Sequence, residues 1–97
     1  MKRLEIIACE AIQVELIEAI EKVVKDFEYT LMPRIEGKGL RTRKQGTQVW
    51  PELNFMLVSY LEDEEGLERA SAAIAATAAR FPKEGVFAAV SEARRIK

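Results

Sequence analysis

The 97-residue sequence contains no histidine and only one cysteine, Cys9. Without an imidazole, neither a Ser-His-Asp triad nor a Cys-His pair can form, and a zinc site of the Cys/His type is excluded within one chain. One cysteine cannot form a disulfide inside the chain, so nothing indicates an oxidising compartment. We expect Cys9 to be a small buried residue and not a reactive thiol.

Long apolar runs are also missing. No run approaches the roughly 20 residues that a membrane-spanning helix needs. Glutamates interrupt the N-terminal sequence MKRLEIIACE too early for a signal peptide. Because 48% of the residues are hydrophobic, the chain can still form a core. Together these features predict a single cytoplasmic domain over residues 1–97, without membrane insertion.

The net charge of −1 conceals an uneven distribution. Residues 34–46 contain five basic side chains and one acidic one, so they carry +4 and leave −5 for the rest of the chain. A second basic cluster, R-R-I-K, stands at positions 94–97. The asymmetry predicts an anion-binding or partner-binding loop on a mildly acidic body, with a merely solvated loop as the alternative.

Hydrophobic periodicity predicts six elements: strands at 2–8, 29–36, 52–61 and 86–91, and helices at 13–27 and 64–80. Asp63 is expected to cap the second helix, and Pro82 to follow its end. The last six residues form either a fifth short strand or an ordered loop. The order βαββαβ predicts an α+β, ferredoxin-like fold, in which two helices cover one face of a four-stranded antiparallel sheet.

The pattern also predicts which side chains face the core and which do not. Pro33 indicates that its strand is an edge strand or contains a bulge. The second helix is expected to bury a stripe made of Leu67, Ala70, Ser71, Ile74, Ala78 and Phe81. The sheet face opposite the helices is expected to carry Met32, Met56, Val58 and Tyr60. An apolar open face of this kind predicts association of copies.

Several segments resemble the PII family of trimeric signalling proteins. The chain begins MKRLEIIA, with Ile7 in register, and residues 35–39 read I-E-G-K-G where the family has V-K-G-F-G. L-I-E-A-I at 16–20 is similar to the family's V-K-E-A-L, and V-W-P-E at 49–52 stands where F-L-P-K returns from a long loop, the T-loop. The final E-A-R-R-I-K resembles E-A-I-R-I-R. The resemblance follows the order of elements along the whole chain.

The resemblance implies a homotrimeric, non-catalytic regulator in signal transduction and nitrogen regulation. Such a protein binds an adenine nucleotide (ATP, ADP or AMP) between subunits and engages a transporter or enzyme through the T-loop. Carried over by position, the ligand site would contain Ile7, Gly37, Lys38, Gly39, Arg41, Lys83, Gly85, Arg95 and Lys97. The partner-binding loop would contain Arg43, Lys44, Gln45 and Trp50. In these roles glycine lets the backbone approach phosphate, and basic side chains pair with its oxygens.

The chain departs from the family in its loops. The second phosphate loop, G-x-x-G-D-G-K in the family, is reduced to F-P-K-E-G at 81–85. Arg41 stands where the family has the glutamine that helps to bind oxoglutarate, and Glu52 replaces a lysine. The loop after Gly37 is short and has no tyrosine, so uridylylation of a loop tyrosine is excluded. These departures predict a divergent member with a different or weaker ligand.

Other classes with this order of elements remain as alternatives. An acylphosphatase-like enzyme needs an arginine in a glycine-rich first loop, and C-E-A-I-Q at 9–13 has neither. An RNA-binding module needs aromatic side chains on one sheet face, whereas Phe55 and Tyr60 fall on opposite faces, and the pI near 5.6 is unfavourable. A trimeric metal-tolerance-like protein without nucleotide binding is the main alternative, although the lack of histidine disfavours copper.

Overall fold

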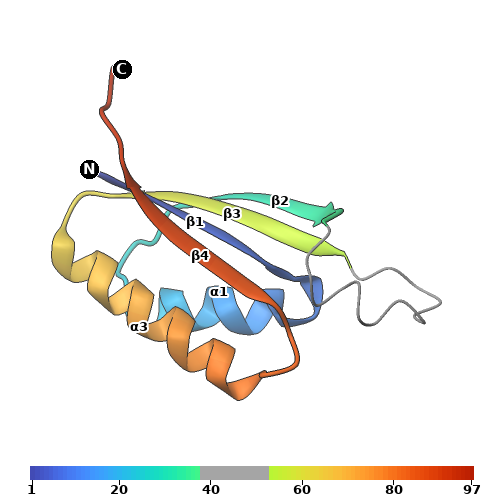
Figure 1. Ribbon diagram of the computed structural model, residues 1–97. Helices are drawn as coiled ribbons and strands as arrows, with labels where there is room; N and C mark the ends of the chain where they lie inside the picture. The colour runs from blue at the N-terminus through green and yellow to red at the C-terminus, as the bar shows by residue number, and fades with distance from the viewer. Residues whose placement is uncertain (38–52) are drawn as a thin grey trace.

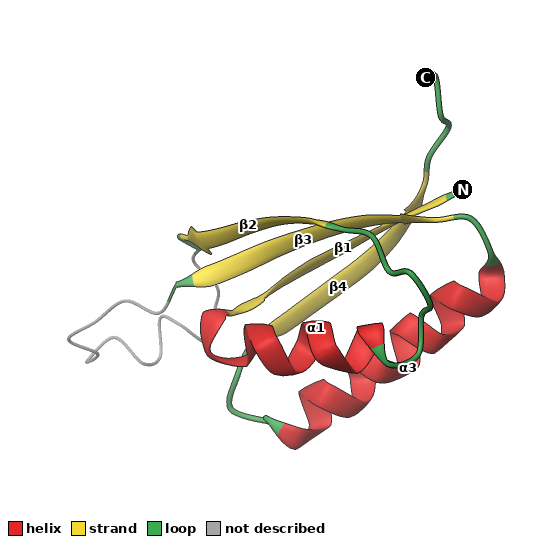
Figure 2. Ribbon diagram, turned by 180° about the vertical axis from the view of Figure 1, so that it is seen from behind, coloured by secondary structure: helices red, strands yellow, loops and turns green. Residues whose placement is uncertain are grey.

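The computed structural model describes residues 1–37 and 53–97. The elements in chain order are β1 (Lys2–Cys9), the 3-10 turn η1 (Glu10–Ile12), α1 (Gln13–Glu21), β2 (Thr30–Ile35), β3 (Asn54–Leu61), α3 (Glu64–Arg80) and β4 (Val86–Glu92). Both helices lie on the same face of the twisted sheet (Figure 1), and Figure 2 shows the two layers from behind. The predicted ferredoxin-like βαββαβ arrangement is confirmed.

The sheet has the strand order β2-β3-β1-β4, and each neighbouring pair is antiparallel. Ile7 of β1 pairs with Met56 of β3 on one side and with Phe87 of β4 on the other. Met56 in turn pairs with Met32 of β2. Because paired residues point to the same face of a sheet, these four apolar side chains form one row across all four strands.

The two edge strands differ in character. In β2 the register shifts between Met32 and Ile35, and Arg34 has a positive φ of 57°. Pro33 lies in this irregular stretch and has no N–H to donate. The prediction of an edge strand or a bulge is therefore confirmed on both counts. In contrast, the β4 sequence VFAAVSE contains no proline, and its one charged residue, Glu92, lies at its end.

The core lies between the sheet and the helices. Alternate residues of β1 and β3 point into it, as the period of two predicts. The largest apolar side chains in it with almost no exposure are Leu4, Ile6, Ile12, Leu16, Ile20, Phe55 and Leu57. Cys9 is also buried, as predicted.

The first helix is shorter than predicted, because α1 ends at Glu21 and not near Phe27. Helix-like hydrogen bonding continues one turn further, since the Val24 N–H donates to the Ile20 carbonyl at 2.9 Å. Asp26 then adopts a positive φ of 55° and turns the chain away from the helix. Val24 and Phe27 still pack on the core, so helical spacing persists in the sequence beyond the end of the helix.

The second helix begins and ends where the sequence predicts. Asp63 is its N-cap, and the Asp63 carboxylate accepts a hydrogen bond from the Gly66 N–H. The predicted apolar stripe is wrong at Ser71, which is exposed. Thr77 is buried instead, and its hydroxyl donates to the Ala73 carbonyl at 2.9 Å. This bond lets a polar side chain enter the core without an unpaired hydrogen-bonding group.

An ion pair links the start of β1 to the end of β4. Lys2 and Glu92 are register partners, and their side chains form an ion pair. The hydrogen bond from Lys2 lowers the pKa of Glu92, and the same bond raises the pKa of Lys2. The Ala93 N–H donates to the Met1 carbonyl at 3.0 Å, after which residues 94–97 leave the sheet as a loop. Of the two predictions for the tail, the loop is confirmed.

Neither helix in the described part of the chain is long and apolar enough to cross a membrane.

Candidate functional site

One end of the sheet, which we call the loop end, gathers three of the predicted ligand residues. Cys9 ends β1 there, Gly37 follows β2, Asn54 begins β3 and Gly85 precedes β4. Cys9 pairs with Asn54, and its N–H donates to the Gly85 carbonyl at 3.1 Å. Ile7 lies two residues before Cys9 on the same strand. Gly37, Gly85 and Ile7, which are far apart in the sequence, therefore lie at or next to the same end of the sheet.

Gly37 lies close to the side chain of Asn54, a residue that no sequence motif indicates. A Cβ atom at Gly37 would lie only 2.8 Å from Nδ2 of Asn54. The reason for glycine here is therefore the lack of space for a side chain. A left-handed backbone is not the reason, since none of the described glycines has a positive φ. Asn54 was missed because β2 and β3 pair across the loop that connects them, and such a pairing leaves no local signal in the sequence.

A comparison of Gly37→Ala with Gly85→Ala tests this packing. At Gly85 an added Cβ meets nothing within 4 Å, so alanine should raise the free energy of unfolding by about 0.4–1 kcal/mol through a less flexible unfolded chain. At Gly37 the Asn54 side chain must move, so the same gain should be absent. Urea denaturation of both variants measures the difference, and an equal gain at the two positions would contradict the packing argument.

A basic side chain also lies near the loop end. The bulge in β2 places Nη1 of Arg34 3.8 Å from Oε1 of Glu10. The Arg34 side chain is 70% exposed, so this pair is accessible to solvent and weak. Its guanidinium is therefore available to an anion approaching this end of the sheet. In the sequence Arg34 is only one of five basic residues in a segment, because the left-handed conformation that orients it leaves no sequence signal.

The sheet face opposite the helices, which we call the open face, is largely apolar, as predicted. Its outward side chains include the row Met32, Met56, Ile7 and Phe87, together with Val58 and Tyr60. Three of them are strongly exposed for apolar or aromatic residues: Met32 at 43%, Tyr60 at 52% and Phe87 at 54%. Ile7, the predicted wall of an adenine pocket, is half-buried on this face, on the inner strand β1 near the loop end.

Not all of the remaining predicted ligand residues lie at the loop end. Lys83 is exposed in the turn before β4. Arg95 and Lys97 lie in the C-terminal loop beyond Glu92, at the opposite end of β1 (Figure 1). At about 3.3 Å per residue, the length of β1 separates the two ends by about 25 Å. A small ligand therefore cannot contact both Gly37 and the basic tail of the same chain.

Seven predicted residues lie outside the described part of the chain: Lys38, Gly39, Arg41, Arg43, Lys44, Gln45 and Trp50. Their assignment to the ligand site and the partner loop stays a prediction.

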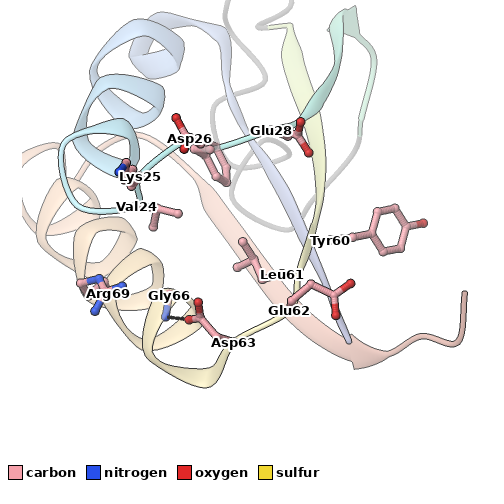
Figure 3. Close-up of a pocket in the computed structure, with 11 residues that line it drawn as sticks. Val24, Lys25, Asp26, Glu28, Tyr60, Leu61, Glu62, Asp63, Gly66 and Arg69 are labelled. Carbon is pink, nitrogen blue, oxygen red and sulfur yellow. Dashed lines mark hydrogen bonds between the residues drawn. The ribbon is translucent and has the colours of Figure 1, made fainter.

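The described residues form a pocket of about 220 Å³ away from the loop end. It is lined by the connection from α1 to β2 and by the junction of β3 with α3: Val24–Glu28, Tyr60–Asp63, Gly66 and Arg69. Figure 3 shows that the Tyr60 ring points away from the helices, while Arg69 lies on the helix side. None of the predicted ligand residues belongs to this pocket.

Two charged side chains of this pocket, Asp63 and Arg69, already have partners within the fold. The Asp63 carboxylate caps α3, and Nε of Arg69 donates to the Val23 carbonyl at 2.9 Å. Arg69 also pairs with Glu65 at 3.5 Å. Among the described residues, no group of three or more His, Cys, Asp or Glu side chains could hold a metal ion. The bond from Arg69 to Val23 joins α3 to the turn that follows α1.

The fold is that of the PII-like signalling proteins. A PII-like signalling protein from Thermus thermophilus superposes with a TM-score of 0.59 at 22% identity, over 93% of this chain and 83% of that one. CPII from Thiomonas intermedia K12, in a structure bound to ADP, AMP and acetate, superposes with a TM-score of 0.59 at 17% identity, over 97% and 88% of the two chains.

The same fold occurs without any natural function. The de novo designed protein Foldit4 superposes with a TM-score of 0.62 at 17% identity, over 96% of this chain and 98% of that one. No protein-family model matches the sequence, and no curated protein matches it either. The function must therefore be argued from the residues and not from the fold alone.

Proposed function

We propose that the protein is a non-catalytic, PII-like regulator that acts in the cytoplasm. It assembles as a homotrimer through its open face, binds an adenine nucleotide between subunits, and acts on a transporter or enzyme through residues 37–50. The observation that carries this proposal is that Gly37 and Gly85 lie together at the loop end, on a fold that is shared over 97% of this chain with CPII, whose structure holds ADP and AMP.

The positions of the predicted ligand residues support a site between subunits. Gly37 and Gly85 lie at the loop end, whereas Arg95 and Lys97 lie about 25 Å away at the other end of β1. A neighbouring copy can bring its basic tail to the loop end of the first copy. Guanidinium and ammonium groups then face the phosphates, which accept charge-assisted hydrogen bonds from them.

Isothermal titration calorimetry with ATP, ADP, AMP and cyclic nucleotides tests the proposal. We expect at least one of them to bind, and Arg95→Ala to weaken that binding about 10- to 100-fold, because hydrogen bonds to charged groups contribute about 1.5–3 kcal/mol. Arg94→Ala is the matched control. It removes the same charge from the same exposed tail, at a position where the PII motif has isoleucine.

Two results would contradict the nucleotide role. One is the absence of heat with every nucleotide at a protein concentration where the trimer is intact. The other is equal weakening by Arg94→Ala and Arg95→Ala, which would indicate a general effect of the positive tail and no specific grip on phosphate. The metal-tolerance-like alternative has no observation in its favour among residues 1–37 and 53–97.

A further inference from the structure

An ion pair lies on the open face, on one of the two inner strands of the sheet. Arg3 and Glu5 are outward-facing residues of β1, an inner strand, and Nη2 of Arg3 lies 3.1 Å from Oε1 of Glu5. Their register partners are Tyr60 and Ser91 for Arg3, and Val58 and Ala89 for Glu5. Two full charges are therefore surrounded by uncharged side chains on the face that we assign to assembly.

The hydrogen-bonding capacity of this pair is not exhausted within the chain. Nε of Arg3 is buried and has no hydrogen-bond partner among the described residues. A guanidinium has five N–H donors, and a carboxylate can accept about four hydrogen bonds. When the face is covered, these groups lose water, which is costly unless other protein groups replace it. A neighbour that brings both a carboxylate and a guanidinium satisfies this need.

A second copy of the chain is such a neighbour. In a closed assembly every copy presents the same face to the symmetry axis, so each contributes one Arg3 and one Glu5. We propose that Arg3 of one copy donates to Glu5 of the next, so that the pairs close into a ring that fixes the register of the subunits. The proposal rests on the assembly through the open face proposed above, and adds the residues that select one packing among many.

Charge reversal distinguishes a bond between copies from a bond within one chain. Arg3→Glu leaves a chain with two acidic groups on the open face, and Glu5→Arg leaves a chain with two basic groups. We expect each variant alone to assemble about 100-fold more weakly than the wild type, because like charges then meet at the interface. A mixture of the two variants should recover a mixed assembly in part, because in a trimer that contains both variants two of the three interfaces join opposite charges and one still joins like charges.

The ion pair of Lys2 with Glu92 provides matched controls. Lys2→Glu and Glu92→Lys change the net charge by the same amounts, and Lys2 lies next to Arg3 but points to the other face of β1. We expect both control variants to assemble like the wild type. Light scattering after size exclusion gives the mass of each sample, native mass spectrometry identifies mixed species, and circular dichroism verifies that each variant is folded.

Each outcome of this experiment decides the matter. A wild-type protein that stays monomeric overturns the open-face assembly and this ring with it. An assembled wild type whose charge-reversed variants also assemble normally overturns the ring alone. Reversed variants that dissociate and do not recover on mixing place the pair within one chain, which also overturns it. Recovery of mixed assemblies, with unaffected Lys2 and Glu92 variants, supports the ring.

Discussion

Phe87→Asp should convert the proposed trimer into a monomer with the 11.0 kDa mass of a single chain. Phe87 lies at one end of the apolar row on the open face, where its side chain is 54% exposed. In a single chain, the aspartate would therefore remain in water and leave the fold intact. In the assembly it would be buried against apolar side chains, which a carboxylate tolerates only with a partner. Light scattering after size exclusion measures the mass directly.

Val14→Asp is the matched control for this change. Val14 is 61% exposed on α1, away from the open face, and an acidic residue in the first turn of a helix is favourable. The control should therefore keep the mass of the wild type. A trimeric Phe87→Asp variant would exclude the open face as the interface, and a monomeric Val14→Asp variant would show that any added charge has the same effect.

Phe55→Ala should give the largest loss of stability among single substitutions of the core. Phe55 has no exposed surface and packs in the core from β3, one of the two inner strands of the sheet. Removing a buried phenyl ring costs about 3–5 kcal/mol, because apolar contacts are lost and a cavity remains. Since the free energy of unfolding of a small domain is about 5–15 kcal/mol in total, this variant should be only marginally folded.

Denaturation in urea at one fixed protein concentration measures this loss, because assembly makes the apparent stability depend on concentration. Val14→Ala is the comparison, since it truncates an exposed side chain on a helix and alanine has the higher helix propensity. It should leave the free energy of unfolding unchanged or slightly higher. A loss below about 1 kcal/mol in Phe55→Ala, which is within the range of surface substitutions, would contradict the assigned core.

The sequence predicts most of the fold because its signals are local. The N-cap at Asp63 and the alternation in β1 and β3 depend on neighbouring residues, and they locate these elements to within one or two positions. The end of α1 depends on the left-handed turn at Asp26, which spacing cannot reveal. Likewise, positions 77 and 78 both follow Ile74 at helical spacing, so periodicity alone did not select Thr77 as the buried one.

The candidate site was less predictable, because it depends on pairing over long distances. The resemblance selected Gly37, Gly85 and Arg95, but no local pattern could show that the two glycines share an end of the sheet and that the arginine lies at the other. Asn54 was missed for the same reason. The partner role rests on the loop at 37–50, which beyond Gly37 lies outside the described residues, and it stays a prediction.

The contrast between the two edge strands limits how copies of this chain can join. Open-ended growth by strand addition requires that both edge strands of each copy can pair with an edge strand of another copy. β4 retains a regular edge, but Pro33 and the left-handed Arg34 interrupt the edge at β2. Pairing through β4 therefore stops after one addition. The irregular edge of β2 in this way disfavours the growth of fibres by strand addition in a small protein that exposes an apolar face.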